Sequence, residues 1–202
     1  DELGFPLAKT KDETINGYFQ TANYLDSSIK AFFDYLKESG LYEKSIIVIY
    51  GDHYGISNSR NPDLAPLIGK TSENWSNYDN AMLQRVPFMV VMPGYEKGQI
   101  INTYGGQIIN TYGGQIDILP TLEHLLGIES NSFLQVGQDL LSPDHQEIVA
   151  FRTANSFVTP KYTSYDGRTY YTESGLEISN LDEQAQTKLE IVRQAASQQL
   201  KI

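Results

Sequence analysis

A long amphipathic helix followed at once by an apolar strand is the feature that most constrains the fold of this chain. Apolar side chains recur at steps of three and four from Ile15 to Leu36, which places one stripe along a helix of about six turns. Thr14 or Asp12 can cap the start of this helix, and Ser39-Gly40 can end it. We expect the stripe to pack against a sheet. Its members are Ile15, Tyr18, Phe19, Ala22, Leu25, Ile29, Phe32, Phe33 and Leu36.

The strand that follows is a continuous apolar run rich in β-branched residues, from Ser45 to Tyr50. It has no alternating polar positions, which is typical of a strand buried on both faces of a parallel α/β sheet. A helix, a short turn and a buried strand make half of a βαβ unit. Ligands in such folds gather beyond the carboxyl ends of the strands. The residues directly after Tyr50 are therefore the first place to look for a functional site.

The middle of the chain predicts one loop excursion, one strand and one helix. Residues 55–84 are polar and predict a surface excursion with a short helix near 79–83. The run 86–92 predicts a second strand, and a proline near its start indicates an edge or entry position. Residues 116–126, closed by Gly127, predict an amphipathic helix. Its apolar residues are Ile118, Leu119, Leu122, Leu125 and Leu126.

The last part of the chain changes to short strands and a final helix. Asp166-Gly167 is a strong hairpin signal, and a helix beginning near Asp182 carries Leu189, Val192 and Ala196 on one face. We therefore expect an α/β domain over 1–145 and a small antiparallel subdomain with a terminal helix over 146–202. The predicted strands are Ile148–Arg152, Ser156–Tyr162 and Arg168–Thr172.

One internal repeat interrupts this pattern. The eight residues Gly98–Gly105 recur without change as Gly106–Gly113. Two copies are too few for a solenoid and indicate a local tandem duplication. An even repeat length keeps every strand residue on its face after a slip by one repeat, so two pairing registers compete and one octad can loop out. Tolerated insertions are typical of surface loops, and we favour that interpretation over a binding role.

Composition excludes several classes of protein. With 15 Lys and Arg against 25 Asp and Glu, the net charge is −10, which argues against nucleic-acid binding by charge. The absence of cysteine excludes disulfide scaffolds, thiolate zinc sites and cysteine nucleophiles. No apolar run approaches the roughly 18 residues that cross a bilayer. The chain begins at Asp1 rather than Met, and we expect it to be a processed or excised piece of a longer protein.

Asp52 and His53 are the strongest candidates for functional residues, because they directly follow the predicted strand, within the segment Tyr50–Gly55. A carboxylate and an imidazole side by side can both turn toward one divalent cation, and this oxygen and nitrogen set suits manganese or zinc. The small Gly51 and Gly55 allow the backbone to bend tightly around them. A capping aspartate beside a surface histidine is the alternative interpretation.

The two other histidines are weaker candidates. His124 lies off the apolar stripe of its predicted helix, so a solvated side chain is expected. His145 follows Pro143-Asp144 in a predicted turn, and neither histidine has a ligand-like partner at close spacing.

Four segments carry a family resemblance: Gly17–Asp26, Tyr50–Ser57, Tyr112–Thr121 and Phe151–Thr153. They resemble the extracellular domain of lipoteichoic acid synthases, in the alkaline phosphatase and sulfatase superfamily. It implies a fold in which residues 1–145 are the C-terminal half of a sulfatase-like catalytic α/β domain. It also implies an enzyme on the extracellular face of a Gram-positive cell membrane, anchored by upstream transmembrane helices that lie outside this chain, or released as an extracellular domain.

The same resemblance implies an activity and a cofactor. The activity is that of a phosphoglycerol transferase, which takes glycerol phosphate from phosphatidylglycerol and extends a poly(glycerol phosphate) chain on a glycolipid anchor. Asp52 and His53 match metal ligands of that family, and the expected ion is Mn²⁺, which activates a threonine nucleophile. The resulting glycerophosphoryl enzyme is resolved by the growing chain.

Two departures from the family pattern shape these expectations. The threonine, a glutamate ligand and the residues that recognise the glycerol head are expected upstream of this segment, in the N-terminal half of the same domain. We therefore expect the 202 residues alone to retain no metal and to turn over no lipid. The second departure is the repeated octad, because the family pattern needs one copy.

Two rival functions stay open at this stage. A phosphoethanolamine transferase or a sulfatase can use the same scaffold and metal ligands, since a fold does not select a substrate. The second rival is a noncatalytic binding or scaffold module.

Overall fold

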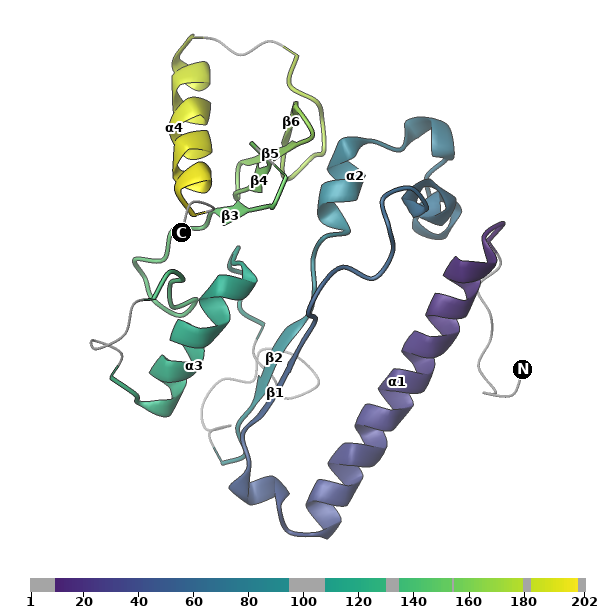
Figure 1. Ribbon diagram of the computed structural model, residues 1–202, viewed down its shortest axis with the longest axis vertical. Helices are drawn as coiled ribbons and strands as arrows, with labels where there is room; N and C mark the ends of the chain where they lie inside the picture. Colours follow the sequence, from purple (N-terminus) through teal and green to yellow (C-terminus); the bar gives the residue numbers. More distant parts are fainter. Residues whose placement is uncertain (1–9, 95–107, 130–134, 154, 180–182, 200–202) are drawn as a thin grey trace. The chain divides into compact units, whose positions relative to one another are not determined.

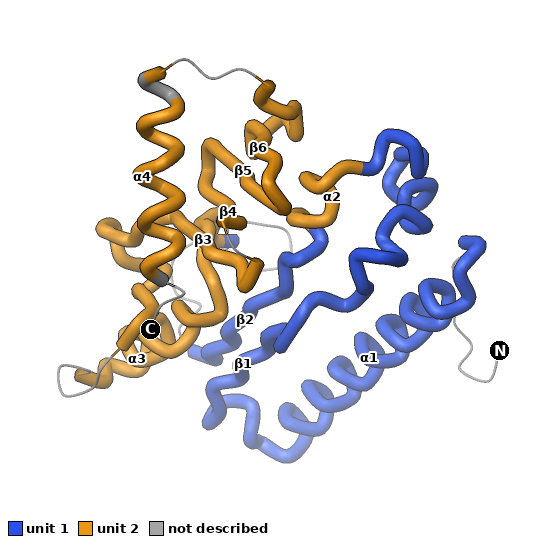
Figure 2. The backbone as a smooth tube through the Cα atoms, turned by 45° about the horizontal axis from the view of Figure 1, so that its top comes forward, with its two compact units in different colours: residues 1–75, 83–108 blue, residues 76–82, 109–202 orange. Residues whose placement is uncertain are grey.

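The computed structural model describes residues 10–94, 108–129, 135–153, 155–179 and 183–199, which combine helices with antiparallel sheets (Figure 1). The predicted α/β fold class is confirmed. The chain forms two compact units, each built from two segments (Figure 2). Unit 1 is Asp1–Trp75 with Leu83–Ile108, and unit 2 is Ser76–Met82 with Ile109–Ile202. Among the described helices, none combines the length and the apolar character needed to cross a membrane.

The predicted first helix is confirmed as α1, Glu13–Glu38. Asp12 is its N-cap: the Oδ1 atom accepts hydrogen bonds from the backbone N–H groups of Thr14 at 2.7 Å and Ile15 at 3.3 Å. The helix ends at Ser39, and Gly40 follows with a φ of 68°, the left-handed conformation that glycine adopts without strain.

The expectation that a sheet covers the stripe of α1 is wrong for the described structure. Only Ile15 and Leu36 of the stripe are buried. Tyr18, Leu25 and Phe32 stay 41%, 59% and 48% exposed. A row of exposed apolar side chains on one helix face is unusual in a folded domain. In the described structure, nothing covers most of this face.

The strand predicted before the Asp-His pair is β1, Ile47–Tyr50, and the second predicted strand is β2, Phe88–Val91. The two strands pair antiparallel, with Ile47 opposite Val91 and Tyr50 opposite Phe88. The prediction of a parallel, doubly buried strand is therefore wrong, and only Ile47 of β1 is buried. An apolar run indicates a strand but carries no signal for the direction of its neighbour.

The polar excursion between these strands contains short helices, and two of them bury some of their residues. The 3₁₀ segment η2, Asn61–Ile68, buries Asn61, Leu64 and Ala65. A second such segment, η3, spans Ser72–Asn74. The predicted short helix is α2, Asn77–Met82, which belongs to unit 2.

Unit 2 also contains α3, Ile118–Leu126, which continues from the 3₁₀ turn η4, Gln115–Asp117, and ends at Gly127 as predicted. Its buried face differs from the prediction. Pro120 and Thr121 are buried, whereas Leu119 and Leu126 are 58% and 49% exposed. The helix is anchored by polar contacts instead.

These polar contacts centre on the buried carboxylate of Asp117. Its Oδ1 accepts from the Gln138 N–H at 2.7 Å, and its Oδ2 accepts from the Gly114 N–H at 2.8 Å. The Thr121 hydroxyl donates to the Asp117 carbonyl at 2.6 Å and accepts from the Leu140 N–H at 2.9 Å. Such satisfied buried polar groups fix a helix in place, since leaving one unpaired costs roughly 1–3 kcal/mol.

The end of unit 2 is a four-stranded antiparallel sheet with the strands in chain order. Asp166 and Gly167 have φ values of 49° and 78° at the hairpin tip, which confirms the predicted turn. The predicted strand Ser156–Tyr162 is in fact two strands, because Pro160 lies in a tight turn where the Thr159 N–H donates to the Tyr162 carbonyl at 2.8 Å. The strands are β3 Val149–Ala150, β4 Phe157–Val158, β5 Tyr162–Tyr165 and β6 Arg168–Tyr171.

The predicted terminal helix is confirmed as α4, Glu183–Gln199. Leu189 and Ala196 of α4 form one buried cluster with Phe157 and Tyr162 of the sheet, and Val192 packs against it. The helix is therefore held to the sheet by the face that the sequence predicted.

Two predictions about chain organisation concern the octad repeat and the domain boundary. Most of the octad repeat, 98–107, lies outside the described residues, and the remainder, 108–113, has no regular secondary structure. The predicted domain boundary at 145/146 falls inside unit 2 and stays a prediction.

Leu189→Ala should lower the free energy of unfolding by about 2–4 kcal/mol, because it removes a buried side chain from the cluster that joins α4 to the sheet. The matched control is Ile191→Ala, on the same helix but 61% exposed, with an expected change within about 0.5 kcal/mol. Urea unfolding followed by circular dichroism measures both. Equal effects would show that this cluster does not hold α4.

Candidate metal centre after strand β1

The candidate site begins where the β1–β2 pairing ends. The Gly51 N–H donates to the Pro87 carbonyl at 3.0 Å, which extends the pairing one residue beyond β1. Asp52 and His53 follow immediately. The sheet therefore fixes the backbone from which both side chains project, as expected for a site at a strand terminus.

Asp52 and His53 lie side by side and face solvent. The His53 Nε2 atom is 3.6 Å from Asp52 Oδ1, and the two side chains are 73% and 84% exposed. The His53 Nδ1 atom is 2.7 Å from the Tyr54 carbonyl oxygen. Because a carbonyl only accepts hydrogen bonds, Nδ1 carries the proton, and the lone pair of the neutral ring is then on Nε2.

This arrangement fits a metal ligand pair. Histidine ligands usually donate their other ring N–H to a carbonyl or carboxylate, which fixes the tautomer and the orientation of the ring. Here Tyr54 supplies that carbonyl, and the Nε2 atom lies next to a carboxylate oxygen. Across the part of the chain that the structure describes, no group of three or more His, Asp and Glu residues is gathered as a metal site. Asp52 and His53 are placed so that both can bind one cation.

Both glycines that flank the pair allow close approach, in addition to the predicted tight bend, which the backbone shows at 52–53 and 55–56. Neither has a positive φ. A Cβ on Gly51 would lie 2.7 Å from the Val86 Cβ, and a Cβ on Gly55 would collide with the Tyr18 hydroxyl of α1. The glycines therefore let the segment before β2 and the Tyr18 side chain of α1 lie directly against the candidate site.

An ion pair connects the start of α1 to the loop after the site. The Arg60 guanidinium contacts the Asp12 carboxylate, the same group that caps α1. Partial desolvation raises the pKa of Asp12, but the hydrogen bonds from Arg60 and from the N–H groups of Ile15 and Thr14 outweigh it and hold this pKa below its usual value. Asp12 therefore stays ionised, and keeps both contacts, to lower pH than an isolated aspartate.

The other histidines are both paired with carboxylates in unit 2. His124 is 58% exposed as predicted, and its Nδ1 lies 2.5 Å from Asp139 Oδ2. His145 lies at the predicted turn, where its N–H donates to the Ser142 carbonyl at 3.1 Å, and its partner is distant in sequence. Its side chain is only 3% exposed, and its Nε2 lies 3.6 Å from Asp117 Oδ2. Asp117 and His145 are too far apart in sequence for any local spacing to show this pair.

Comparison with known proteins identifies the family. The family described as Sulfatase matches residues 2–128, well over half of the chain and including both candidate ligands. The chain belongs to the sulfatase family. Its fold and its Asp52–His53 pair can therefore be interpreted within that family.

Several relatives are named lipoteichoic acid synthases, which confirms the resemblance found in the sequence. Lipoteichoic acid synthase 1 of Bacillus subtilis is 44% identical over 93% of this chain and 27% of its own length. Lipoteichoic acid synthase 2 of the same organism is 43% identical over 88% of this chain and 25% of its own length. The lipoteichoic acid synthase of Staphylococcus saprophyticus is 39% identical over 84% and 24%. The chain thus spans about a quarter of the length of these curated relatives.

Gly51→Ala should destabilise the fold by about 1–3 kcal/mol, because the new methyl group would overlap the Val86 Cβ, which is bonded to the backbone and cannot swing away. Gly17→Ala is the matched control. Gly17 lies inside α1 with nothing within 4 Å of an added Cβ, so alanine should be neutral or stabilise by up to about 1 kcal/mol. Urea unfolding distinguishes them, and equal values for the two variants would contradict the close approach.

Proposed function

We propose that the protein acts as a phosphoglycerol transferase of the lipoteichoic acid synthase type. It transfers glycerol phosphate from phosphatidylglycerol to a glycolipid-anchored poly(glycerol phosphate) chain. The observation that carries the proposal is the 39–44% identity to lipoteichoic acid synthases over 84–93% of this chain. The position of the Asp52–His53 pair at the end of β1 supports it.

Asp52 and His53 would hold the divalent cation, with Mn²⁺ as the proposed ion. Carboxylate oxygen and neutral imidazole nitrogen suit this metal. When bound, the cation neutralises charge on phosphoryl oxygens and lowers the pKa of a hydroxyl nucleophile. This chain would position two ligands of the ion. The Tyr54 carbonyl holds the His53 ring, and the Gly51–Pro87 hydrogen bond holds the backbone next to Asp52.

The net charge of the chain also supports a bound cation. The net charge is −10, which disfavours a phosphate substrate unless positive charge is supplied locally. The remaining ligands and the threonine nucleophile would come from a part of the polypeptide that precedes this chain, the N-terminal half of the catalytic domain.

The exposed stripe of α1 supports this division of the catalytic domain. Tyr18, Leu25 and Phe32 lie on one face of the helix and are largely exposed. The curated relatives are about four times as long as the matched segment. We therefore take the preceding part of the polypeptide to cover this face. We also place the enzyme on the extracellular side of the cell membrane, anchored through a transmembrane region outside this chain.

A second candidate function is another reaction of the sulfatase family, favoured by the family match itself. A phosphoethanolamine transferase or a sulfatase would use the same metal pair with a different nucleophile and substrate. Release of glycerol phosphate from phosphatidylglycerol, compared with hydrolysis of aryl sulfates and of phosphatidylethanolamine by the same preparation, separates these activities.

Asp52→Ala and His53→Ala in the intact protein should each lower Mn²⁺ affinity and phosphatidylglycerol turnover by roughly 100-fold or more, because each removes a direct ligand. Isothermal titration with Mn²⁺ and a lipid turnover assay measure these effects. His124→Ala, which changes an exposed histidine paired with Asp139, is the control and should be near wild type.

Two outcomes would contradict the proposal. Full activity of Asp52→Ala in the intact protein would favour a noncatalytic scaffold role for this segment. Turnover of phosphatidylglycerol by the 202 residues alone would show that no preceding segment is needed.

Leu25→Gln should have little effect on the stability of the 202-residue chain, where Leu25 is 59% exposed. In the longer polypeptide we expect a loss of about 2–4 kcal/mol, because glutamine would be buried at a covered position. Tyr24→Gln is the control, since Tyr24 is equally exposed but lies off the stripe. If Leu25→Gln is neutral in both polypeptides, no segment covers this face.

A further inference from the structure

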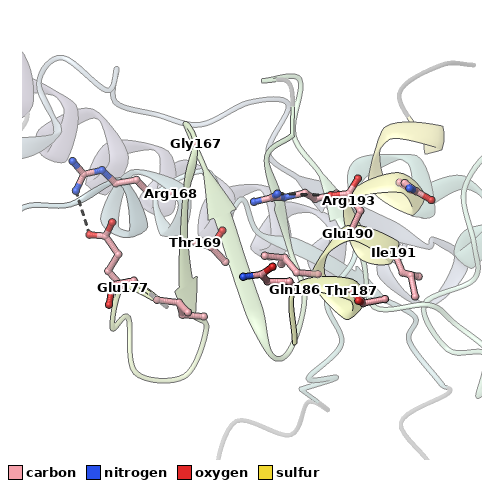
Figure 3. Close-up of a pocket in the computed structure, with 13 residues that line it drawn as sticks. Gly167, Arg168, Thr169, Glu177, Gln186, Thr187, Glu190, Ile191 and Arg193 are labelled. Atoms are coloured by element: carbon pink, nitrogen blue, oxygen red, sulfur yellow. Dashed lines mark hydrogen bonds and ion pairs between the residues drawn. The ribbon is translucent and has the colours of Figure 1, made fainter. Parts of the chain in front are cut away.

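Unit 2 contains a polar pocket between strand β6 and helix α4, shown in Figure 3. Its volume is about 750 Å³, within the usual range for small-molecule sites. Thr169 of β6 and Gln186, Gln194 and Arg193 of α4 contribute hydroxyl, amide and guanidinium groups to its wall. The buried cluster of Leu189 and Phe157 joins the same helix and sheet. The pocket is thus built on two packed elements.

Arg193 is the least satisfied charged group of this pocket. Its Nε atom is buried and has no hydrogen-bond partner. Its nearest ionic contact joins Nη1 to Glu190 Oε2 at 3.8 Å, which is beyond hydrogen-bond distance. The side chain as a whole is 34% exposed and lines the pocket, so a ligand can approach the guanidinium through its atoms other than the buried Nε. A second pocket of about 340 Å³ is also lined by Arg193, together with Asn155 and Ser197.

Arg168, in the same pocket, provides a built-in comparison. Its Nη1 donates to Glu177 Oε2 at 3.2 Å, and its side chain is 61% exposed. Figure 3 shows this pair at one end, and Arg193 and Gln186 extending from α4 toward Thr169 of β6. One guanidinium of the pocket therefore has its acceptor, and the other lacks one for its buried N–H.

We propose that this pocket binds a phosphate-class oxyanion at Arg193. A buried N–H donor without an acceptor costs free energy, and more so on a charged group. A planar guanidinium matches the oxygen spacing of phosphate and can donate two parallel hydrogen bonds to it. The hydroxyl of Thr169 and the amides of Gln186 and Gln194 suit hydroxyl groups carried on the same ligand.

The carboxylates of the pocket limit the affinity. Glu177 forms an ion pair with Arg168. Glu190 lies beside Arg193, and its negative charge would repel a bound anion. Glu190 is 58% exposed, so solvent screens part of that repulsion. We therefore expect weak binding, with a Kd of about 1 mM, which corresponds to roughly −4 kcal/mol.

The site shares no residue with the Asp52–His53 pair, and it stands whether or not the transferase proposal holds. Its test therefore uses the intact protein carrying Asp52→Ala, with EDTA present, so that binding through a metal is removed. The probes are inorganic phosphate, glycerol 3-phosphate and glycerol. The readouts are isothermal titration and the NMR signal of the Arg193 Nε–H, which should shift when the guanidinium binds an anion.

Inorganic phosphate should bind saturably and shift the Arg193 signal, whereas glycerol alone should do neither. Arg193→Gln should weaken binding at least about tenfold, because it removes the charge and the paired donors. Arg168→Gln is the matched control and should change the Kd less than about twofold, since Arg168 already has its partner. Glu190→Gln should tighten binding about two- to fivefold by removing the opposing charge.

Glycerol 3-phosphate distinguishes the sources of the phosphate group. Tighter binding than inorganic phosphate assigns the pocket to a polyol phosphate, and equal binding assigns it to the phosphate group alone. Either result supports the oxyanion site.

Three results would overturn the proposal. The first is that inorganic phosphate shows no saturable binding at a concentration about ten times the expected Kd. The others are equal losses of phosphate affinity in Arg193→Gln and Arg168→Gln, or equal affinity for glycerol and glycerol 3-phosphate. If Arg193→Gln fails to fold by circular dichroism, Glu190→Gln keeps Arg193 in place, and unchanged or weaker binding by it would contradict the proposal.

Discussion

The close approach of Gly51 to Val86 is the constraint on which the candidate site depends. It allows the Gly51 N–H to reach the Pro87 carbonyl, so the β1–β2 pairing continues up to the residue before Asp52. The backbone of a ligand pair is thus held by a sheet although its side chains are exposed. Tyr54 then selects the tautomer of His53 through one hydrogen bond. Orientation in this site comes from main-chain contacts, and so it does not require a buried pocket.

Local features of the sequence predicted the helices and the hairpin well. The ends of α1 follow from Asp12 and Gly40, and the tip of the β5–β6 hairpin follows from Asp166-Gly167, because each depends on residues only a few positions apart. The position of Asp52 and His53 after a strand was equally local. Their role in binding a metal remains a prediction.

Contacts between distant segments were beyond the reach of the sequence. An apolar run does not state whether its neighbour is parallel or antiparallel, so the pairing of β1 with β2 was mispredicted. His145 is buried against Asp117, which already accepts two backbone hydrogen bonds, and no spacing rule links these residues. The unpaired Nε of Arg193 likewise depends on how α4 lies on the sheet. Such sites require tertiary structure because their partners come from separate elements.

The assignment of α2 to unit 2 has a consequence for how the protein can be divided. Tyr78 of α2 donates a hydrogen bond to the Thr172 carbonyl at 2.6 Å, and its ring lies 5.8 Å from that of Tyr170. Gly175 leaves room for that same ring. A fragment cut at residue 109 would keep the four-stranded sheet but lose this cover over the fully buried Tyr170. A fragment that begins at residue 109 therefore lacks part of unit 2, because α2 lies between two stretches of unit 1 along the chain.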